Sequence, residues 1–409
     1  MNRANLDKSV VLHKPMACYR PVKSLVLVSL LASWLATPRR PAWAAKTENR
    51  ELIVVINPRS GRFVKHPEEI EQIKRLAGAH GKVYVPPTAE AFRQAAKEIA
   101  HLPNPGKKVL VPIGGDGLIQ HLLNDIAREN PSQLPSLRIL PLQGGSNNTI
   151  VKNLKGLSGN PVDVLSDYIA TVQANAPHPD GVSEERGEPR FDVHENRVPF
   201  LEVNDQGDVQ RGLFFVTGVP GELLAGTDGK IHVGKAFFSV LKQMMTGSKR
   251  LHRVPAKLSL NGIHDEKDRK LLYAVVSGLT KTHPLLRILK KPNPGELSVK
   301  ASSMSIPETI LKGADLVTGL SLTRNPNKEV SASTKELQIE FNEPGIHYSI
   351  DGELYKSNSK TLKVTRQGDL NLLSLEKRGG GGRGLWGLWG RKLKETGARV
   401  VRPPKARPR

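Results

Sequence analysis

Short apolar runs alternate with amphipathic stretches in the first part of the chain. Four runs have the length and composition of buried strands, namely residues 52–56, 83–85, 109–113 and 137–142. Apolar residues recur at helical spacing in residues 68–80, 89–101 and 118–126, with Gly81 as a candidate helix stop and Thr88 as a candidate N-cap. This alternation predicts a parallel sheet with helices on both faces and glycine-rich turns at the carboxyl ends of its strands.

The pattern becomes mostly strand-like after a polar linker at residues 175–182. The runs that predict strands are 198–203, 212–217, 256–260, 271–277, 297–301 and 362–365. A helical insertion is predicted at 233–245. Residues 337–341 and 346–350 are predicted to pair as a hairpin that leads to Asp351-Gly352-Glu353. We therefore expect a second, mostly β domain.

The positive charge is concentrated at the two ends of the chain. Of the net charge of +22, residues 1–50 carry +7 and residues 376–409 carry +9, which leaves only +6 for the body. Basic flanks suit anionic lipid surfaces as well as nucleic acid, and the mildly basic body makes nucleic acid the less favoured partner. The single cysteine, Cys18, lies in the N-terminal flank, which excludes disulfides and cysteine-based metal sites from the body.

Both flanks have compositions typical of segments outside a folded core. Residues 24–36 form an apolar run of 13 residues, followed by Ala42-Trp43-Ala44. Segment 1–46 is open to three interpretations: a cleaved export signal, a membrane-surface anchor, or a start codon placed too early. Residues 376–409 contain four consecutive glycines and then Trp386 and Trp389 among basic residues. This tail is consistent with a membrane-interface segment, a solvated disordered tail, or an RNA-binding segment.

The stretch 109–121 combines an apolar strand, the turn Gly114-Gly115-Asp116-Gly117 and the start of a helix. Glycines allow close approach of an anion, and a helix N-terminus offers unpaired N–H groups, so this stretch is a candidate phosphate cradle. The alternative is a plain strand-to-helix turn in which Asp116 is the N-cap. This motif alone does not decide between them.

Five stretches in order resemble the diacylglycerol kinase catalytic-domain superfamily of lipid kinases. They are Asn57-Pro58-Arg59-Ser60-Gly61, Thr88 at a helix start, Gly114 to Gly117, residues 140–142 with the turn that follows, and Asp351-Gly352-Glu353. The resemblance implies an α/β domain over 47–180, with a three-layer, NAD kinase-like parallel sheet. It also implies a β-sandwich over 181–375 and an active site in the cleft between the two.

The resemblance further implies an ATP site and a catalytic carboxylate. The residues on the ATP side would be Asn57, Thr88, Gly114, Gly115, Asp116, Gly117, Gly145, Ser146 and Asn147. Glu353 would be the general base for the lipid hydroxyl, with Asp116 as the second candidate. Without the other stretches, Asp351-Gly352-Glu353 would be interpreted as a simple hairpin turn. Magnesium would arrive with ATP, and its protein ligands are not identifiable from the sequence.

Three positions depart from the pattern of that superfamily. Leu118 stands where a threonine is usual, Asn148 where the acidic residue of the second glycine turn is usual, and Pro294-Gly295 where Asp-Gly often supports a magnesium site. The resemblance implies an ATP-dependent lipid kinase acting on diacylglycerol or a related lipid. It would act at a membrane, on the cytoplasmic face or after export. The departures keep a catalytically inactive lipid- or nucleotide-binding relative open. A NAD kinase is less favoured, and the oligomeric state, a homodimer included, stays open.

Overall fold

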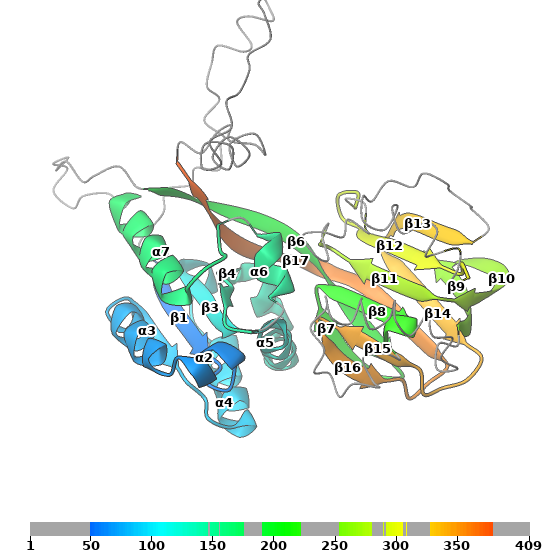
Figure 1. Cartoon of the computed structure of the whole chain (residues 1–409), viewed down its shortest axis with the longest axis horizontal. Helices are drawn as coiled ribbons and strands as arrows, with labels where there is room; N and C mark the ends of the chain where they lie inside the picture. The colour runs from blue at the N-terminus through cyan, green and yellow to red at the C-terminus, as the bar shows by residue number, and fades with distance from the viewer. Residues whose placement is uncertain are drawn as a thin grey trace, which may run out of the picture. The chain divides into compact units, whose positions relative to one another are not determined.

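The computed structural model describes residues 50–145, 148–154, 156–175, 190–221, 253–279, 289, 292–305, 308 and 328–378 (Figure 1). These residues belong to one compact unit of the chain, Glu48–Arg409. The predicted segment 1–46, the helical insertion at 233–245 and the tail from residue 379 lie outside the described residues, as does most of the predicted linker. Among the described helices, none is both long and apolar enough to cross a membrane.

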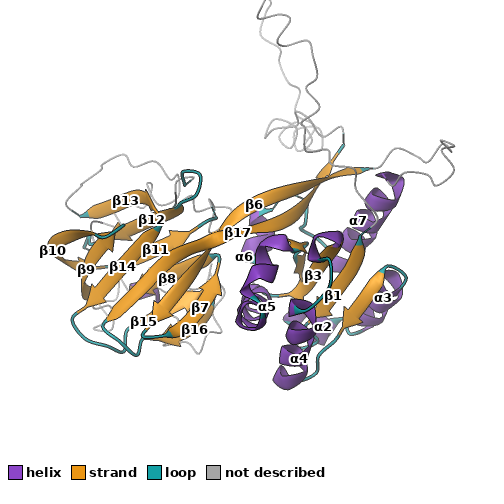
Figure 2. Cartoon of the chain, turned by 180° about the vertical axis from the view of Figure 1, so that it is seen from behind, coloured by secondary structure: helices purple, strands orange, loops and turns teal. Residues whose placement is uncertain are grey.

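A parallel sheet forms the first part of the described chain (Figure 2). Its strands are β1 (Glu51–Ile56), β2 (Gly81–Tyr84), β3 (Lys108–Gly114), β4 (Arg138–Ile139) and β5 (Leu142–Gln143). They lie in the order β4-β3-β1-β2, with β5 also beside β3, and every pair among them is parallel. Strands β1 and β3 are apolar and almost wholly buried, as expected for strands covered on both faces.

Helices connect and cover these strands. They are α2 (Gly61–Lys65), α3 (Glu68–Gly78), α4 (Ala89–Ala100), α5 (Asp116–Glu129), α6 (Thr149–Asn153) and α7 (Pro161–Asn175), with short 3-10 turns at Pro105–Lys107 and Pro131–Ser136. Helix α3 contacts α7, and α4 contacts α5. Thr88 is the N-cap of α4, as predicted, because its Oγ1 accepts a hydrogen bond of 3.2 Å from the backbone N of Ala91.

Two details of this part correct the sequence prediction. Gly81 does not end α3, which stops at Gly78; it opens β2 instead. A Cβ at position 81 would lie 1.9 Å from the carbonyl oxygen of Leu52, so the close pairing of β1 with β2 requires glycine there. The predicted strand 137–142 is divided into β4 and β5, because Pro141 between them has no N–H to give to a sheet.

A β-sandwich follows, whose first sheet continues the parallel one. Its strands are β6 (Phe191–Asp205), β7 (Asp208–Gly212), β9 (Val254–Leu260), β10 (Ile263–Leu271), β14 (Glu336–Phe341) and β17 (Thr361–Lys377). The second sheet has the order β13-β12-β11-β8-β15-β16, all antiparallel. It consists of β8 (Phe214–Gly218), β11 (Tyr273–Ser277), β12 (Leu297–Ser302), β13 (Glu329–Thr334), β15 (His347–Ile350) and β16 (Glu353–Lys356). Apolar side chains from both sheets form one core.

The two longest strands, β6 and β17, pair along most of their length. Near its start β17 pairs with β14, and at Asn371–Leu372 it pairs in parallel with β4. Leu362 and Val364 therefore belong to the sandwich core, whereas Leu372 and Leu375 belong to the core of the α/β part. The sequence pattern predicted only 198–203 and 362–365 of these strands, because polar residues interrupt the alternation elsewhere.

The predicted hairpin of residues 337–341 and 346–350 is wrong. Strand β14 lies between β9 and β17 in the first sheet, whereas β15 lies between β8 and β16 in the second. The chain changes sheets at Gly345, which has a φ of 88°. The actual hairpin is β15–β16, and its turn is Asp351-Gly352, with φ of 49° and 95°. Positive φ at both central residues is the requirement of a tight type I′ turn.

Candidate active site

Strands β1 and β3 lie side by side at the point where the strand order of the parallel sheet reverses. The chain leaves β1 to form β2 on one side and returns to form β3 on the other side. At such a point of reversal the loops after the two strands run apart, and ligands of open α/β sheets bind there. Asn57 follows β1 and Gly115 follows β3, and the backbone N of Asn57 donates to the carbonyl of Ile113 at 3.1 Å. The fold therefore brings the Asn57–Gly61 and Gly114–Gly117 stretches to one edge of the sheet.

The two glycine turns are in direct backbone contact. The backbone N atoms of Gly144 and Gly145 both donate to the carbonyl oxygen of Gly114, at 2.9 and 3.0 Å. A Cβ at position 145 would lie 2.3 Å from the Cα of Gly115, and one at position 144 would lie 2.8 Å from the Cα of Gly114. Glycine is required at these positions because the two backbones touch.

Asp116 is not the N-cap of its own helix, so that interpretation is wrong. Gly115 is the N-cap of α5, and Asp116 is the first residue of the helix. Its carboxylate accepts hydrogen bonds from the backbone N atoms of Thr149 (2.7 Å) and Ile150 (3.1 Å), which open α6. Burial raises the pKa of Asp116, and these two hydrogen bonds oppose the rise. The carboxylate thus anchors the segment that carries the second glycine turn.

Asn148 closes that second turn. Its Oδ1 accepts from the backbone N of Gly145 at 3.1 Å, and its Nδ2 donates to the carbonyl oxygen of Gly145 at 2.6 Å. An aspartate could make only the first of these bonds, since it has no donor when ionised. Asn148 also has a φ of 48°, which asparagine tolerates better than most residues. Ser146 and Asn147, both predicted on the ATP side, lie outside the described residues.

Glu353 lies against the first glycine turn. It is the first residue of β16, and a Cβ at Gly117 would lie 2.0 Å from its Oε1. The half-buried carboxylate therefore rests on the backbone at the start of α5. The structure thus brings the late Asp-Gly-Glu motif to Gly114–Gly117, and the Asp351-Gly352 pair is at the same time a hairpin turn.

Asp351 supports this hairpin from inside. Its carboxylate accepts from the backbone N of Leu213 (2.9 Å to Oδ2) and from that of Phe214 (2.9 Å to Oδ1). Burial raises the pKa of Asp351 to about 8; the charge of Asp116 adds to the rise, and the two backbone hydrogen bonds oppose it. Two buried carboxyl groups, those of Asp116 and Asp351, therefore lie near each other.

We expect a pH dependence of stability from Asp351. Its pKa is about 8 in the folded protein and about 3.9 in an unfolded chain, so between these values the folded state binds a proton that the unfolded state releases. The free energy of unfolding contributed by this group is fully present below about pH 4 and is lost as the pH rises to about 8. Urea titrations at pH 5 and pH 8 should show a smaller decrease for Asp351→Asn than for the wild type. The exposed Asp208→Asn is the control, and an equal decrease in all three proteins would contradict the prediction.

A polar stripe on α5, which the sequence analysis missed, links the glycine turn to the sandwich. Asp116, Gln120 and Asn124 follow at four-residue intervals and are 7%, 0% and 5% exposed. Gln120 Nε2 donates to the Tyr355 hydroxyl at 2.7 Å. Asn124 Oδ1 accepts from the backbone N of Arg211 at 2.7 Å, and its Nδ2 donates to the Arg211 carbonyl at 2.9 Å. The signal available in the sequence was this i, i+4, i+8 spacing of polar residues on an otherwise apolar helix face.

The structure shows the surroundings of three further positions singled out from the sequence, namely Thr88, Leu118 and Gly295. The hydrogen bond described for the Thr88 side chain goes to its own helix, α4. Leu118 is buried, and its Cδ2 would lie 2.7 Å from a Cβ at Gly114, so it packs beneath the first glycine turn where the resemblance expects a hydroxyl. Gly295, with a φ of 78°, lies in the Asn293–Glu296 turn, which is closed by a backbone hydrogen bond of 3.1 Å.

The described residues do not provide a magnesium site of their own. Among them no group of three or more His, Cys, Asp or Glu side chains could hold a metal ion. Near the glycine turns, Asp116 and Asp351 already accept backbone hydrogen bonds, which leaves Glu353 as the carboxylate placed at the first glycine turn. Mg²⁺ usually keeps several waters and is held by one or two carboxylates together with substrate phosphates, so an ion that arrives with ATP needs no cage built from protein side chains alone.

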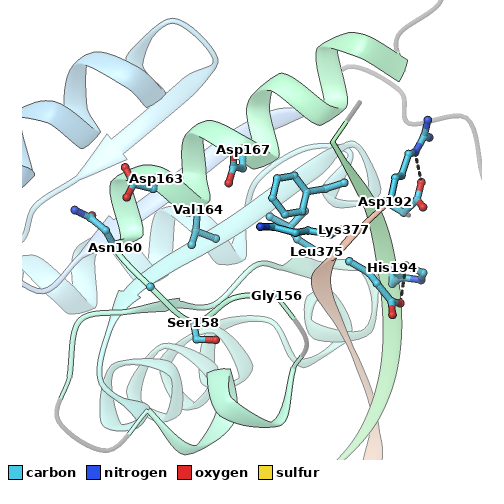
Figure 3. Close-up of a pocket in the computed structure, with 14 residues that line it drawn as sticks. Gly156, Ser158, Asn160, Asp163, Val164, Asp167, Asp192, His194, Leu375 and Lys377 are labelled. Atoms are coloured by element: carbon cyan, nitrogen blue, oxygen red, sulfur yellow. Dashed lines mark hydrogen bonds and ion pairs between the residues drawn. The ribbon is translucent and has the colours of Figure 1, made fainter. Parts of the chain in front are cut away.

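A cavity of about 680 Å³ lies in another place, beside α7 and the paired ends of β6 and β17 (Figure 3). Asp163 and Asp167 of α7 lie on one side of it, and Asp192, His194 and Lys377 on the other. Two ion pairs line it, Arg378–Asp192 at 2.7 Å and His194–Glu376 at 3.3 Å. None of the predicted site residues is among its lining residues, so the cavity is separate from the glycine turns.

Comparisons with known proteins identify one matching family model and several similar structures. Residues 51–176 match the family model of the diacylglycerol kinase catalytic domain. A candidate diacylglycerol kinase from Bacillus anthracis str. Sterne has a similar structure, with a TM-score of 0.52 and 17% identity over 78% of this chain and 94% of that chain. A second structure with that description and source has a TM-score of 0.51 and 15% identity, with the same coverage. A yeast NADH kinase complexed with NADH has a TM-score of 0.42 and 11% identity, covering 87% of this chain and 90% of that one.

No curated protein sequence matches the chain. The predicted fold class, an α/β part followed by a β-sandwich, is confirmed.

Proposed function

Because residues 51–176 belong to the diacylglycerol kinase catalytic domain family, we propose that the chain is an ATP-dependent lipid kinase. It transfers the γ-phosphoryl group to the hydroxyl of diacylglycerol or a related lipid. The observation that carries the proposal is the contact of the Glu353 carboxylate with Gly117, at the N-terminus of a 14-residue helix and beside two apposed glycine turns. Phosphoryl transfer needs a phosphate cradle and a nearby base, and this arrangement supplies both.

The glycine turns form the ATP side of the proposed site. The first turn of the 14-residue helix α5 offers backbone N–H groups and the positive end of the helix dipole, both of which favour an anion. Asn57 lies beside Gly114, since a Cβ at position 114 would lie 3.4 Å from the Asn57 Cβ. Magnesium, when bound with ATP, neutralises charge on the phosphates.

Glu353 is the proposed general base. The lipid hydroxyl oxygen forms a bond to the γ-phosphorus while the bond from that phosphorus to the β–γ bridging oxygen breaks, and the electron pair leaves on ADP. Glu353 accepts the hydroxyl proton. Asp116 suits this role less, because it is buried and both of its oxygens accept backbone hydrogen bonds. Asp116 is instead a positioning residue that holds the second glycine turn through α6.

The basic flanks support a membrane location for this activity. A kinase for a bilayer lipid must act at a lipid surface, and anionic lipids attract clustered Lys and Arg. Residues 1–50 and 376–409 carry +7 and +9. We therefore propose that the protein associates with anionic membranes through its flanks.

A catalytically silent nucleotide- or lipid-binding protein is the second candidate. The specific observation in its favour is Leu118, which packs an apolar side chain beneath the glycine turn where the resemblance expects a threonine hydroxyl. Such a protein would bind ATP and leave it unchanged.

The test uses the full chain with Mg²⁺, ATP labelled at the γ-phosphate, and mixed micelles that contain diacylglycerol, monoacylglycerol, ceramide or sphingosine. Labelled lipid that is formed with one of these acceptors supports the kinase and identifies its substrate class. If no lipid is labelled while ATP still raises the melting temperature, the kinase proposal fails and the silent binding protein replaces it. If ATP neither reacts nor raises the melting temperature, both proposals are wrong.

A further inference from the structure

Glu353 is the first residue of a short strand, β16, and its position depends on how that strand is held. Strand β16 (Glu353–Lys356) is an edge strand of its sheet and pairs only with β15 among the described strands. Edge strands with a single partner open more easily than central ones. The position of the Glu353 carboxylate over Gly117 therefore depends on what ties β16 to the helix.

The tie is the hydrogen bond between Gln120 and Tyr355. The side chains of Glu353 and Tyr355 lie on the same face of β16, since side chains two residues apart along a strand share a face. On α5, Gln120 lies three residues after Gly117 and so on the adjoining part of the same helix face. The 2.7 Å bond from Gln120 Nε2 to the Tyr355 hydroxyl thus runs beside the contact of Glu353 with Gly117, between the same two elements.

Both side chains are held firmly. Gln120 is fully buried. The Tyr355 ring stacks on Tyr348 of β15 with centroids 5.4 Å apart and an angle of 16° between the ring planes. Burial raises the pKa of Tyr355, the hydrogen bond with Gln120 opposes the rise and the nearby charge of Glu353 adds to it, so its hydroxyl stays protonated at neutral pH. A second anchor follows four residues along α5, where Asn124 bonds both backbone groups of Arg211.

We infer that Gln120 and Tyr355 are positioning residues, which hold the Glu353 carboxylate over the first glycine turn. This inference rests on the proposed function, in which Glu353 is the base. Gln120 and Tyr355 act through Glu353 and take no proton from the acceptor themselves. The same geometry means that the base and the glycine turn are assembled before a lipid binds.

Tyr355→Phe is the first variant, because it removes the hydroxyl and keeps the ring on Tyr348. We expect kcat for lipid phosphorylation to fall about tenfold while KM for ATP stays within twofold, since misplacing a reacting group lowers the chemical step rather than nucleotide binding. Tyr348→Phe is the matched control: it removes a hydroxyl from the stacked ring on the neighbouring strand and should leave kcat unchanged. A fall in melting temperature with unchanged kcat in Tyr355→Phe would overturn the inference.

A double-mutant cycle tests whether the two residues act as one unit. Gln120→Leu and Tyr355→Phe should each lower kcat, and the double variant should lose no more than the worse single variant. If the kcat losses of the two single variants multiplied in the double variant, the inference that Gln120 and Tyr355 act as one unit would be overturned. Wild type and Glu353→Gln are assayed alongside, so that a failure of the proposed function, with no lipid phosphorylated by the wild type, is recognised separately.

Hydrogen exchange provides a measurement that does not need activity. Only the backbone amides of Glu353 and Tyr355 face β15, because alternate residues of an edge strand bond to its one partner. These two amides should exchange faster in Tyr355→Phe than in the wild type, and those of the Tyr348→Phe control should exchange at the wild-type rate. Equal exchange in all three proteins would show that the Gln120–Tyr355 bond does not hold β16, and the inference would fall even if the protein were a lipid kinase.

Discussion

Glu353→Gln is expected to lower kcat for lipid phosphorylation by about 10²–10⁴-fold, the usual contribution of general acid–base catalysis. Glutamine has nearly the same shape, so it can rest on Gly117 as the carboxylate does, but it cannot accept the hydroxyl proton. Because the glycine turns stay intact, ATP should still raise the melting temperature as much as in the wild type. Steady-state kinetics together with thermal unfolding at increasing ATP would measure both quantities.

The control for this variant is Glu340→Gln, which makes the same chemical change at an exposed position on β14 and should keep wild-type kcat. If Glu353→Gln kept more than half of the wild-type kcat, Glu353 would not be the base. Asp116→Asn would then be the next variant to assay. That variant also weakens the anchor of α6, so its loss of activity would count only where its melting temperature matched that of the wild type.

Gly145→Ala is expected to abolish the thermal protection given by ATP and to destabilise the protein by about 1–3 kcal/mol. The added methyl group would lie 2.3 Å from the Cα of Gly115 and 3.0 Å from its N, both of which are backbone atoms that cannot turn aside. The two glycine turns must then separate, which breaks the hydrogen bonds to the Gly114 carbonyl and widens the proposed phosphate cradle.

Gly78→Ala is the matched control, because a Cβ at that position meets nothing within 4 Å and alanine favours the helix in which it lies. Its stability should equal or exceed that of the wild type by up to about 1 kcal/mol, and its ATP protection should be unchanged. Urea denaturation measures the stability of both variants, and thermal melting at increasing ATP measures their protection by the nucleotide. If Gly145→Ala keeps its protection by ATP, the contact between the turns is not part of a nucleotide site.

Several features followed from the sequence because their causes are local. The apolar runs of β1 and β3 and the spacing of apolar residues in α3, α4 and α5 are periodic patterns that a short segment contains in full. Thr88 begins α4 through a bond to a residue three positions away. Asp351-Gly352 forms a tight turn because these two residues accept positive φ.

Other features depended on partners that are distant in the chain. Gly81 is glycine because β2 pairs closely with Leu52, and Asp116 caps α6 rather than its own helix. Residues 337–350 divide between two sheets, because each strand pairs with neighbours that the local pattern does not specify.

The candidate site shows the same division. The glycine turn of residues 114–117 could be predicted from the local sequence, and Glu353 could be identified through a resemblance. Only the tertiary structure placed the Glu353 carboxylate on Gly117, joined Gln120 to Tyr355 across 235 positions, and made Gly145 touch Gly115. Sequence periodicity reports which face of an element is buried, whereas contacts between elements depend on how the sheets stack and which backbones meet.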